Sequence, residues 1–223
     1  MQSFSCSAIL FDLDGVLVDS IASVERAWRK FAARHKLDVA TVLEAAHGHR
    51  SIDTIRLLVP DADAEAENLI VEQDEVDDAE SVNATEGAGE LLSILPPQRW
   101  TIVTSGTRPL ATARLRAAAL PIPKHLVAAD EVVNGKPHPE PYIKGATALG
   151  FRPAECVVFE DAPTGIRSAR DAGAKVIGVA GTYDPAQLKA AQALAGSLAH
   201  VSVEINCDGL IVRIPEFAGV TAQ

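Results

Sequence analysis

Four carboxylates, arranged in two close pairs, are the side chains of this sequence best suited to chemistry. Asp12 and Asp14 follow one short apolar run, and Glu160 and Asp161 stand at the end of another. On extended backbone Asp12 and Asp14 would face the same side, and carboxylates so close repel each other unless a cation lies between them. Either pair alone could be surface turn acids, but both pairs together favour a site for Mg²⁺, which prefers oxygen ligands.

A second set of residues could bind the oxygens of a phosphate group. Thr104 offers a hydroxyl, and the backbone amides of Ser105 and Gly106 could point inward, because glycine permits close backbone approach. Lys136 would supply a compact positive charge. Taken alone it would be a solvated loop lysine, but the prolines at positions 137 and 139 indicate a fixed loop.

Together these side chains are suited to phosphoryl transfer, which needs donors and cations around three phosphate oxygens. An aspartate can act as a nucleophile and form an aspartyl-phosphate. Asp12 directly ends its apolar run, so it is the better placed nucleophile, and Asp14 could protonate the departing alkoxide and then deprotonate the attacking water. We therefore expect Asp12, Asp14, Thr104 and Lys136 to be the catalytic residues.

These residues can share one site only if the elements before them form one sheet. Four apolar runs indicate strands buried on both faces, with helical stretches between them. The runs span residues 8–11, 100–103, 156–159 and 175–179, a fifth could span 126–129, and the helices are expected over 108–119, 139–149 and 164–172. This alternation predicts a doubly wound parallel α/β sheet, which binds ligands outside the carboxyl ends of its strands.

The stretch from about 20 to 85 differs, because it is rich in alanine, leucine and charge and has few β-branched runs. We interpret it as a helical insert after the first strand, with residues 1–19 and 86–223 as the α/β core. Asp and Glu are dense between 61 and 80, while 57–98 contains no Lys or Arg. A solvated acidic helix face is the expected explanation, and an acidic patch that binds a partner is the alternative.

The last part of the chain indicates a β-hairpin. Residues 201–205 alternate, Asp208-Gly209 is a turn signal and residues 210–214 are mostly apolar. The hairpin could extend the edge of the sheet, and we see no chemistry in it.

The net charge of the protein limits the classes of partner that it is expected to bind. The 223 residues carry a formal net charge of -10, and no basic face is evident of the kind that a nucleic-acid binder needs. No apolar run approaches the length that spans a bilayer. We expect a cytoplasmic protein, acting as a monomer on a small phosphomonoester, with no nucleic-acid or membrane partner.

Four segments of the sequence, in this order, resemble the motifs of the haloacid dehalogenase superfamily. They are Phe11-Asp12-Leu13-Asp14-Gly15-Val16-Leu17-Val18-Asp19-Ser20, Val103-Thr104-Ser105-Gly106-Thr107-Arg108, Gly135-Lys136-Pro137 and Val158-Phe159-Glu160-Asp161-Ala162-Pro163-Thr164-Gly165. The resemblance covers residues 8 to about 182. It implies a Rossmann-like core, a phosphorylated nucleophile at Asp12 and an acid/base at Asp14. It also implies Mg²⁺ held by Asp12, by the carbonyl of Asp14 and by Asp161, with Glu160 acting through a metal-bound water.

The insert resembles the small helical cap of one branch of that superfamily. Residues 103–108, 135–142 and 160–163 are similar to fungal phosphatases of glycerol phosphate and 2-deoxyglucose 6-phosphate. β-Phosphoglucomutase shares the cap and the motifs, but it relies on a histidine twelve residues after the nucleophile. Val24 occupies that position here, and valine cannot take a proton, so hydrolysis is favoured.

The resemblance also suggests residues that would contact the rest of the substrate. Arg50 could reach from the cap, and Ser105, Gly106 and Arg108 could bind substrate from the core. Asp19 and Ser20 are expected to cap the first helix of the insert. The sequence thus predicts a Mg²⁺-dependent phosphatase of a small sugar or polyol phosphate. A mutase like β-phosphoglucomutase is the alternative, and a non-catalytic phosphate-binding protein is a third hypothesis.

Overall fold

A six-stranded parallel sheet forms the centre of the computed structural model, which describes residues 1–46 and 48–217. Its strands, in spatial order, are β6 (Leu126–Val127), β5 (Trp100–Val103), β2 (Ala8–Phe11), β7 (Cys156–Glu160), β8 (Lys175–Val179) and β9 (Ala193–Ala195). The strands predicted from the apolar runs are confirmed, and β9 is an addition at one edge. Short 3₁₀ helices connect the elements: η1 (Ala79–Ser81), η2 (Pro97–Arg99), η3 (Ala129–Glu131), η4 (Pro153–Glu155), η5 (Pro185–Leu188) and η6 (Leu198–His200).

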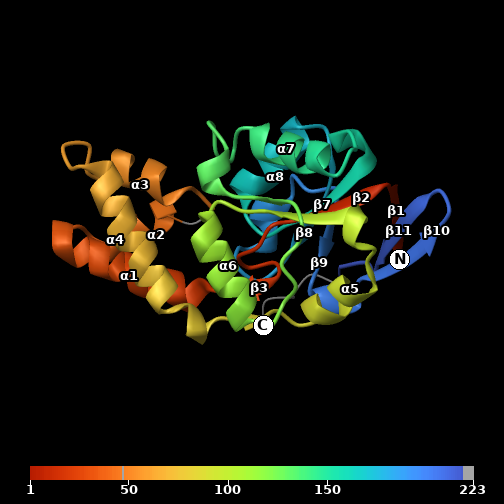
Figure 1. The fold of residues 1–223 in the computed structure, drawn as a ribbon, viewed down its shortest axis with the longest axis horizontal. Coiled ribbons are helices and arrows are strands. Elements are labelled where there is room, and N and C mark those ends of the chain that lie inside the picture. The colour runs from red at the N-terminus through yellow and green to blue at the C-terminus, as the bar shows by residue number, and fades with distance from the viewer. Residues whose placement is uncertain (47, 218–223) are drawn as a thin grey trace.

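Helices cover both faces of this sheet, which explains the unbroken apolar runs. In β2, Ile9 and Phe11 pack into one buried cluster with α5 (Ala88–Ile94) and α6 (Arg108–Ala117). Ala8 and Leu10 pack into a second cluster, with α7 (Glu140–Ala148) and α8 (Pro163–Asp171). Figure 1 shows α7 and α8 on the opposite side of the sheet from α5. A strand covered on both faces has no polar side, and the predicted doubly wound α/β fold is confirmed.

Four helices form an insert beside the core: α1 (Ile21–His35), α2 (Val39–Ala46), α3 (Ser51–Leu58) and α4 (Ala64–Asp77). We call α1–α4 the helical insert. The chain enters it through β3 (Val18–Asp19) and leaves it through β4 (Asn83–Ala84), and these two short strands pair antiparallel. The insert has its own apolar core around Phe31, Val42 and Ile55. It follows the first strand of the parallel sheet, as predicted, although one further strand precedes that sheet in the chain.

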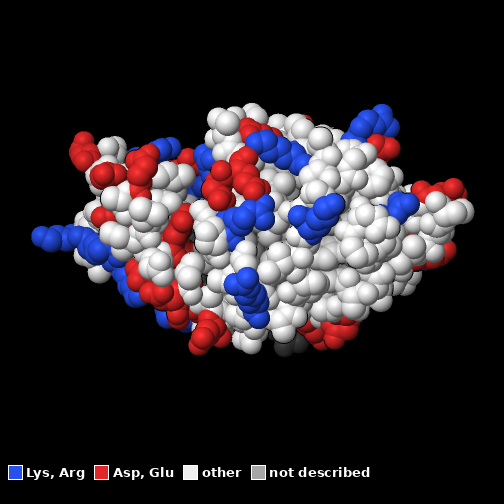
Figure 2. Space-filling model, viewed as in Figure 1, with Lys and Arg blue, Asp and Glu red and all other residues white. Residues whose placement is uncertain are grey.

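Helix α4 explains much of the acidic stretch, because it lies against the basic helix α1. Lys30 Nζ lies 2.7 Å from Asp74 Oδ1, and Arg34 Nη2 lies 3.3 Å from Glu67 Oε2. Figure 2 shows charged side chains of both signs over the insert, at the left of the view. Partly exposed pairs of this kind add little stability, so these acids pair with α1 without contributing much to the free energy of folding.

The predicted hairpin is present as β10 (Ser202–Asn206) and β11 (Gly209–Ile214), but the expectation that it extends the central sheet is wrong. It pairs instead with β1 (Gln2–Cys6) in a separate antiparallel sheet of order β1-β11-β10. The sequence pattern could not show β1, whose residues are mostly exposed or half-buried. Figure 1 places this sheet at the end of the molecule away from the helical insert.

None of the helices in the described part of the chain combines the length and the apolar composition that crossing a bilayer needs.

Gly145 in α7 offers a test of the packing between this helix and the sheet. A Cβ at this position would lie 2.6 Å from Val103 Cγ2 of β5, whereas a Cβ at Gly89 in α5 would meet nothing closer than 3.9 Å. Alanine normally stabilises a helix relative to glycine by about 0.5–1 kcal/mol. We predict the opposite sign for Gly145→Ala, a net loss of about 1–2 kcal/mol from overpacking.

Urea denaturation of both variants would measure these changes. Gly89→Ala is the matched control and should be neutral or stabilising. A Gly145→Ala variant as stable as the Gly89→Ala variant would contradict the close approach of α7 to β5.

Candidate active site

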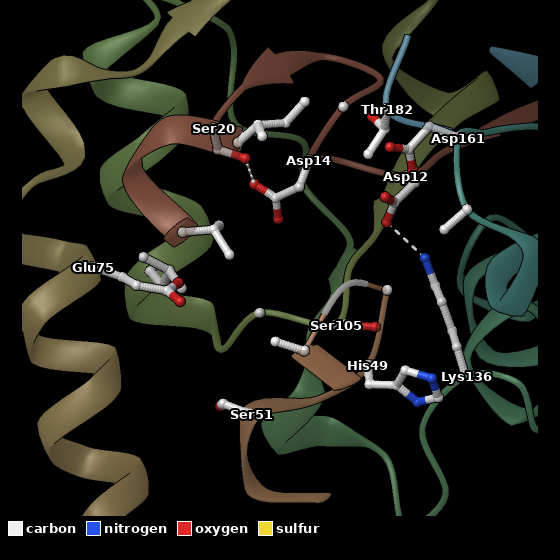
Figure 3. Close-up of a pocket in the computed structure, with 18 of the residues that line it drawn as sticks. Asp12, Asp14, Ser20, His49, Ser51, Glu75, Ser105, Lys136, Asp161 and Thr182 are labelled. Atoms are coloured by element: carbon white, nitrogen blue, oxygen red, sulfur yellow. Dashed lines mark hydrogen bonds and ion pairs between the residues drawn. The ribbon is translucent and has the colours of Figure 1, made fainter. Parts of the chain in front are cut away.

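A pocket that is partly open to solvent lies between the helical insert and the carboxyl ends of the central strands. Its core wall comes from the loops after β2, β5, β7 and β8 and from Lys136, and its other wall comes from α1, α4 and the loop before α3. Figure 3 shows Asp12, Asp161 and Lys136 on one side of this space and Glu75 on the other. The carboxyl edge of the sheet therefore holds the predicted motif residues.

Four charged side chains are buried together on the core wall. Lys136 Nζ donates to Asp12 Oδ1 at 2.6 Å and to Glu160 Oε1 at 2.7 Å, and Asp161 lies beside them. Their exposed fractions run from 1% for Glu160 to 7% for Asp12. Strands β2 and β7 are neighbours, with Phe11 opposite Phe159. Asp12 follows Phe11 and Glu160 follows Phe159, so these two acids lie side by side. We call Asp12, Lys136, Glu160 and Asp161 the buried charge cluster.

The cluster has more negative than positive charge, which its pKa values reflect. Burial raises the pKa of Asp12 to about 7, against the opposing effect of Lys136. Burial, with the nearby charges of Glu160 and Asp12, also raises the pKa of Asp161 well above its usual range. Burial alone would lower the pKa of Lys136, but the attraction of Asp12 and Glu160 outweighs burial and raises it. Lys136 thus stays charged but cannot neutralise three carboxylates.

These three carboxylates are arranged as a cation site. One oxygen from each of Asp12, Glu160 and Asp161 lies within 4.8 Å of the other two. Glu160 is already engaged, since it accepts from Lys136, from the Tyr142 hydroxyl at 3.0 Å and from the Ala162 amide at 2.8 Å. Hard oxygen ligands with excess negative charge fit a divalent cation such as Mg²⁺. Asp12 and Asp161 accept fewer hydrogen bonds than Glu160 and are therefore better able to act as its ligands.

Asp14 does not join this cluster, although it lies two residues from Asp12. Its Oδ1 accepts from Ser20 Oγ at 2.6 Å and lies 2.8 Å from Nη1 of Arg114. Ser20 does hold the position before α1, as predicted, but its hydroxyl makes no capping bond and donates to Asp14 instead. The Asp14 carboxylate is therefore held in a fixed position at the pocket wall, apart from Asp12 (Figure 3).

Arg114 links Asp14 to the helical insert. Its Nη2 lies 2.8 Å from Glu75 Oε2 of α4, and only 2% of Arg114 and 6% of Glu75 are exposed. Burial raises the pKa of Glu75 to about 7, while Arg114 acts to lower it. A buried ion pair of this kind fixes geometry more than it adds stability. It joins the core and the insert at the pocket.

The loop after β5 is arranged differently from the expectation. Thr104 is buried and does not line the pocket; its Oγ1 accepts from the Gly106 amide at 3.0 Å. That amide is therefore engaged within the loop. Ser105 and Gly106 do line the pocket, and the buried Ser105 hydroxyl has no partner among the described residues. Ser105 is the residue of this motif with a free polar group at the pocket.

The two arginines expected to contact substrate lie outside the pocket lining. Arg50 is held by Asp53, with Nε 2.6 Å from Oδ2, and its Nη1 donates to the carbonyls of Val132 and Val133 at 3.2 Å. Arg108 is bound to Glu131 and to the Leu126 carbonyl. Neither contributes to the pocket, because carboxylates and carbonyls of nearby loops occupy both guanidinium groups. Arg50 instead joins the insert to the loop that carries Lys136.

The sequence patterns did not indicate Arg114 or Glu75, and the acidic stretch was expected to be a solvated helix face, with a partner-binding patch as the alternative. The structure corrects this: Glu72 and Glu75 of α4 line the pocket. A signal was present, because Arg114 falls among Leu110, Ala111 and Leu115 on the buried side of α6. A charged residue on an otherwise apolar helix face indicates a buried partner.

Known proteins resemble the chain over most of its length. Hexitol phosphatase A of Escherichia coli is 42% identical over 93% of this chain and 98% of its own. Glycerol-1-phosphate phosphohydrolase 2 of Saccharomyces cerevisiae is 37% identical over 82% of this chain and 78% of its own. The crystal structure of a hydrolase from Pseudomonas syringae superposes with a TM-score of 0.77, at 30% identity, and covers 86% of this chain and 94% of that one.

The fold and the buried charge cluster thus define a hydrolase with a parallel α/β core and a helical insert over the carboxyl ends of its strands. Residues 6–173 match the haloacid dehalogenase-like hydrolase family, and the chain belongs to that family. The resemblance found in the four sequence motifs is confirmed.

Removal of the Lys136 charge tests whether the cluster is ionised. Lys136→Met would leave Asp12 and Glu160 buried without their shared cation, and losing one partner of a buried pair costs about 3–5 kcal/mol. We predict a fall in melting temperature of roughly 6–20 °C in a buffer with EDTA, at about 2–4 °C per kcal/mol for a chain of this size.

Differential scanning calorimetry would measure this change. Lys189→Met, at an exposed position, is the control and should leave the melting temperature within about 2 °C of the wild type. An equally small change for Lys136→Met would mean that the carboxylates are protonated rather than paired with lysine.

Proposed function

We propose that this protein is a Mg²⁺-dependent phosphatase that hydrolyses a small sugar or polyol phosphate through an aspartyl-phosphate on Asp12. The buried charge cluster carries this proposal, because it joins a carboxylate, a lysine and a cation site at the floor of one pocket. The relatives named hexitol phosphatase and glycerol-1-phosphate phosphohydrolase support the substrate class.

Asp12 acts as the nucleophile. Its Oδ1 is held by Lys136, so its other oxygen would attack phosphorus while the ester P–O bond breaks. Lys136 keeps its charge through the reaction and stabilises the negative oxygens of the transferring group. Ser105 lines the same pocket with an unpartnered hydroxyl, and we assign it to a phosphate oxygen. Thr104 acts indirectly in this scheme, by holding the loop through the Gly106 amide.

Asp14 acts as the general acid and then the general base. It would first give a proton to the departing alkoxide and later take a proton from the water that attacks phosphorus, which breaks the bond to Asp12 and releases phosphate. Ser20 and Arg114 hold its carboxylate at the pocket wall. This separation from the buried charge cluster suits a group that serves the leaving oxygen rather than the metal.

Mg²⁺ would be held by Asp12 and Asp161, with the Asp14 carbonyl and with Glu160 through a bound water. When bound, it supplies positive charge to the phosphoryl oxygens. The residues of this chain provide the remaining chemistry.

The helical insert acts as the cap that closes over the substrate, with residues 20–85 as its extent. Val24 lines the pocket at the position where a mutase would need a histidine, so the pocket offers no proton acceptor there to activate a sugar hydroxyl. This supports hydrolysis over the mutase alternative. The monomeric state and the cytoplasmic location remain predictions from the sequence.

Substitution of the nucleophile tests the proposal. Asp12→Asn should lower phosphate release by about 10³-fold or more, because the amide cannot form the acyl-phosphate. Colorimetric assay of phosphate with Mg²⁺ and a panel of glycerol, hexitol and hexose phosphates would measure the change. Asp19→Asn, at an exposed position outside the pocket, should keep the wild-type rate. Undiminished release by Asp12→Asn would refute the assignment, and sugar phosphate isomers as the sole products would favour a mutase.

A further inference from the structure

Two carboxylates of the helical insert face the pocket from the side opposite the buried charge cluster. Glu72 and Glu75 stand three residues apart on α4, so they lie on the same face of the helix. Both line the pocket. Figure 3 shows Glu75 across the open space from Asp12, Asp161 and Lys136. A phosphate bound at the cluster would therefore direct the rest of its molecule toward these two acids.

Both carboxylates are held in place by other side chains. Glu72 accepts from the Asn68 amide at 2.7 Å and from the Thr107 hydroxyl at 3.2 Å, while Glu75 is bound by Arg114 at 2.8 Å. Ionised carboxylates only accept hydrogen bonds, and each has room for about four. Their remaining lone pairs can take hydroxyl donors from a bound molecule. A polyol or sugar carries hydroxyl donors of this kind.

The two cationic side chains of the pocket, Lys136 and Arg114, are already paired with carboxylates and cannot neutralise a second anionic group on a substrate. The described lining includes six carboxylates, of Asp12, Asp14, Glu72, Glu75, Glu160 and Asp161, and two lysine or arginine side chains, of Lys136 and Arg114. Lys136 already binds Asp12 and Glu160, and Arg114 already binds Asp14 and Glu75. One Mg²⁺ balances one phosphate dianion, so the excess negative charge of the pocket stays uncompensated. A further anionic group on the substrate would meet Glu72 and Glu75 without a counter-charge.

Part of the insert wall is apolar, although His49 and Ser51 also line the pocket on that side. Ile21, Val24 and Trp28 of α1 line the pocket beside the two acids. Carbon-bound hydrogens of a short polyol chain can pack against this surface, while its hydroxyls reach the carboxylates. A wall of this composition is matched to an uncharged polyhydroxylated chain.

We propose that Glu72 and Glu75 determine specificity at the distal end of the substrate: they bind hydroxyls and exclude phosphate esters that carry a second negative group. The inference rests on the proposed phosphatase function and narrows its substrates to uncharged polyol and sugar monophosphates. It also predicts that bisphosphates and phosphorylated sugar acids are poor substrates.

A matched substrate pair tests this directly. Glycerol 1-phosphate and the 3-phosphoglycerate of the same configuration differ by the exchange of one terminal CH₂OH for a carboxylate. At pH 8 the wild type should prefer glycerol 1-phosphate by at least about 100-fold in kcat/KM, since juxtaposed like charges strongly disfavour the wrong ligand. The same preference should hold for a hexitol 6-phosphate over 6-phosphogluconate.

Removal of the charge of either Glu72 or Glu75 should reduce the preference for glycerol 1-phosphate over 3-phosphoglycerate. Glu72→Gln removes one negative charge, and Glu75→Gln also frees one side of Arg114 for a substrate carboxylate. Each variant should reduce the ratio of the two kcat/KM values by about tenfold, and should tighten competitive inhibition by 3-phosphoglycerate. Glu65→Gln changes an exposed glutamate of the same helix outside the pocket, and should leave the ratio unchanged.

The outcomes separate this inference from the function on which it rests. The inference is supported if the wild type prefers glycerol 1-phosphate, if Glu72→Gln or Glu75→Gln lowers the ratio of the two kcat/KM values, and if Glu65→Gln leaves that ratio unchanged. Equal hydrolysis of both substrates by the wild type overturns it but leaves the phosphatase function standing. Wild-type discrimination that neither variant narrows also overturns it, because other residues then set specificity. Absence of phosphate release from every ester with Mg²⁺ refutes both the function and the inference.

Discussion

The structure is organised around the burial of more negative than positive charge at the carboxyl ends of β2 and β7. Desolvation disfavours ionised carboxylates, and Lys136 compensates only part of this cost by bonding Asp12 and Glu160 together. The apolar strands beneath provide the rigid support that holds three acids and a lysine within bonding distance. An arrangement with this excess of negative charge has little value for stability, which is why we propose that it binds a metal and a phosphate together.

The helical insert extends this constraint to the other side of the pocket. Arg114 carries one charge between Asp14 of the core and Glu75 of the insert. The residue that we propose for proton transfer and helix α4 therefore share a single buried cation. Arg50 makes a second link, from the insert to the carbonyls of the loop that carries Lys136. Both sides of the pocket are thereby positioned relative to each other by buried or half-buried charged side chains.

Much of this could be predicted from the sequence because strands buried on both faces leave unbroken apolar runs, and because a polar residue that ends such a run falls at the active-site edge. Asp12 and Glu160 were found in this way. Contacts between the core and the insert left no comparable pattern: the partners of Arg114 come from segments 39 and 100 residues away. Glu75 lies in a stretch where other acidic residues do face solvent, so the sequence did not distinguish it from them. Arg50 was expected to contact substrate, because the sequence does not show that its partners lie in the loop before Lys136. Local periodicity shows which face is buried, but the partner of a buried charge is a tertiary property.

The position of a bound cation tests the central claim most directly, since Mn²⁺ accepts the same oxygen ligands as Mg²⁺ and scatters anomalously. Crystals soaked in Mn²⁺ should give one strong anomalous peak within about 2.5 Å of carboxylate oxygens of both Asp12 and Asp161. A peak at Glu72 and Glu75 instead, or no peak in the pocket at a Mn²⁺ concentration that supports activity, would contradict the assignment of the buried charge cluster as the metal and phosphate site.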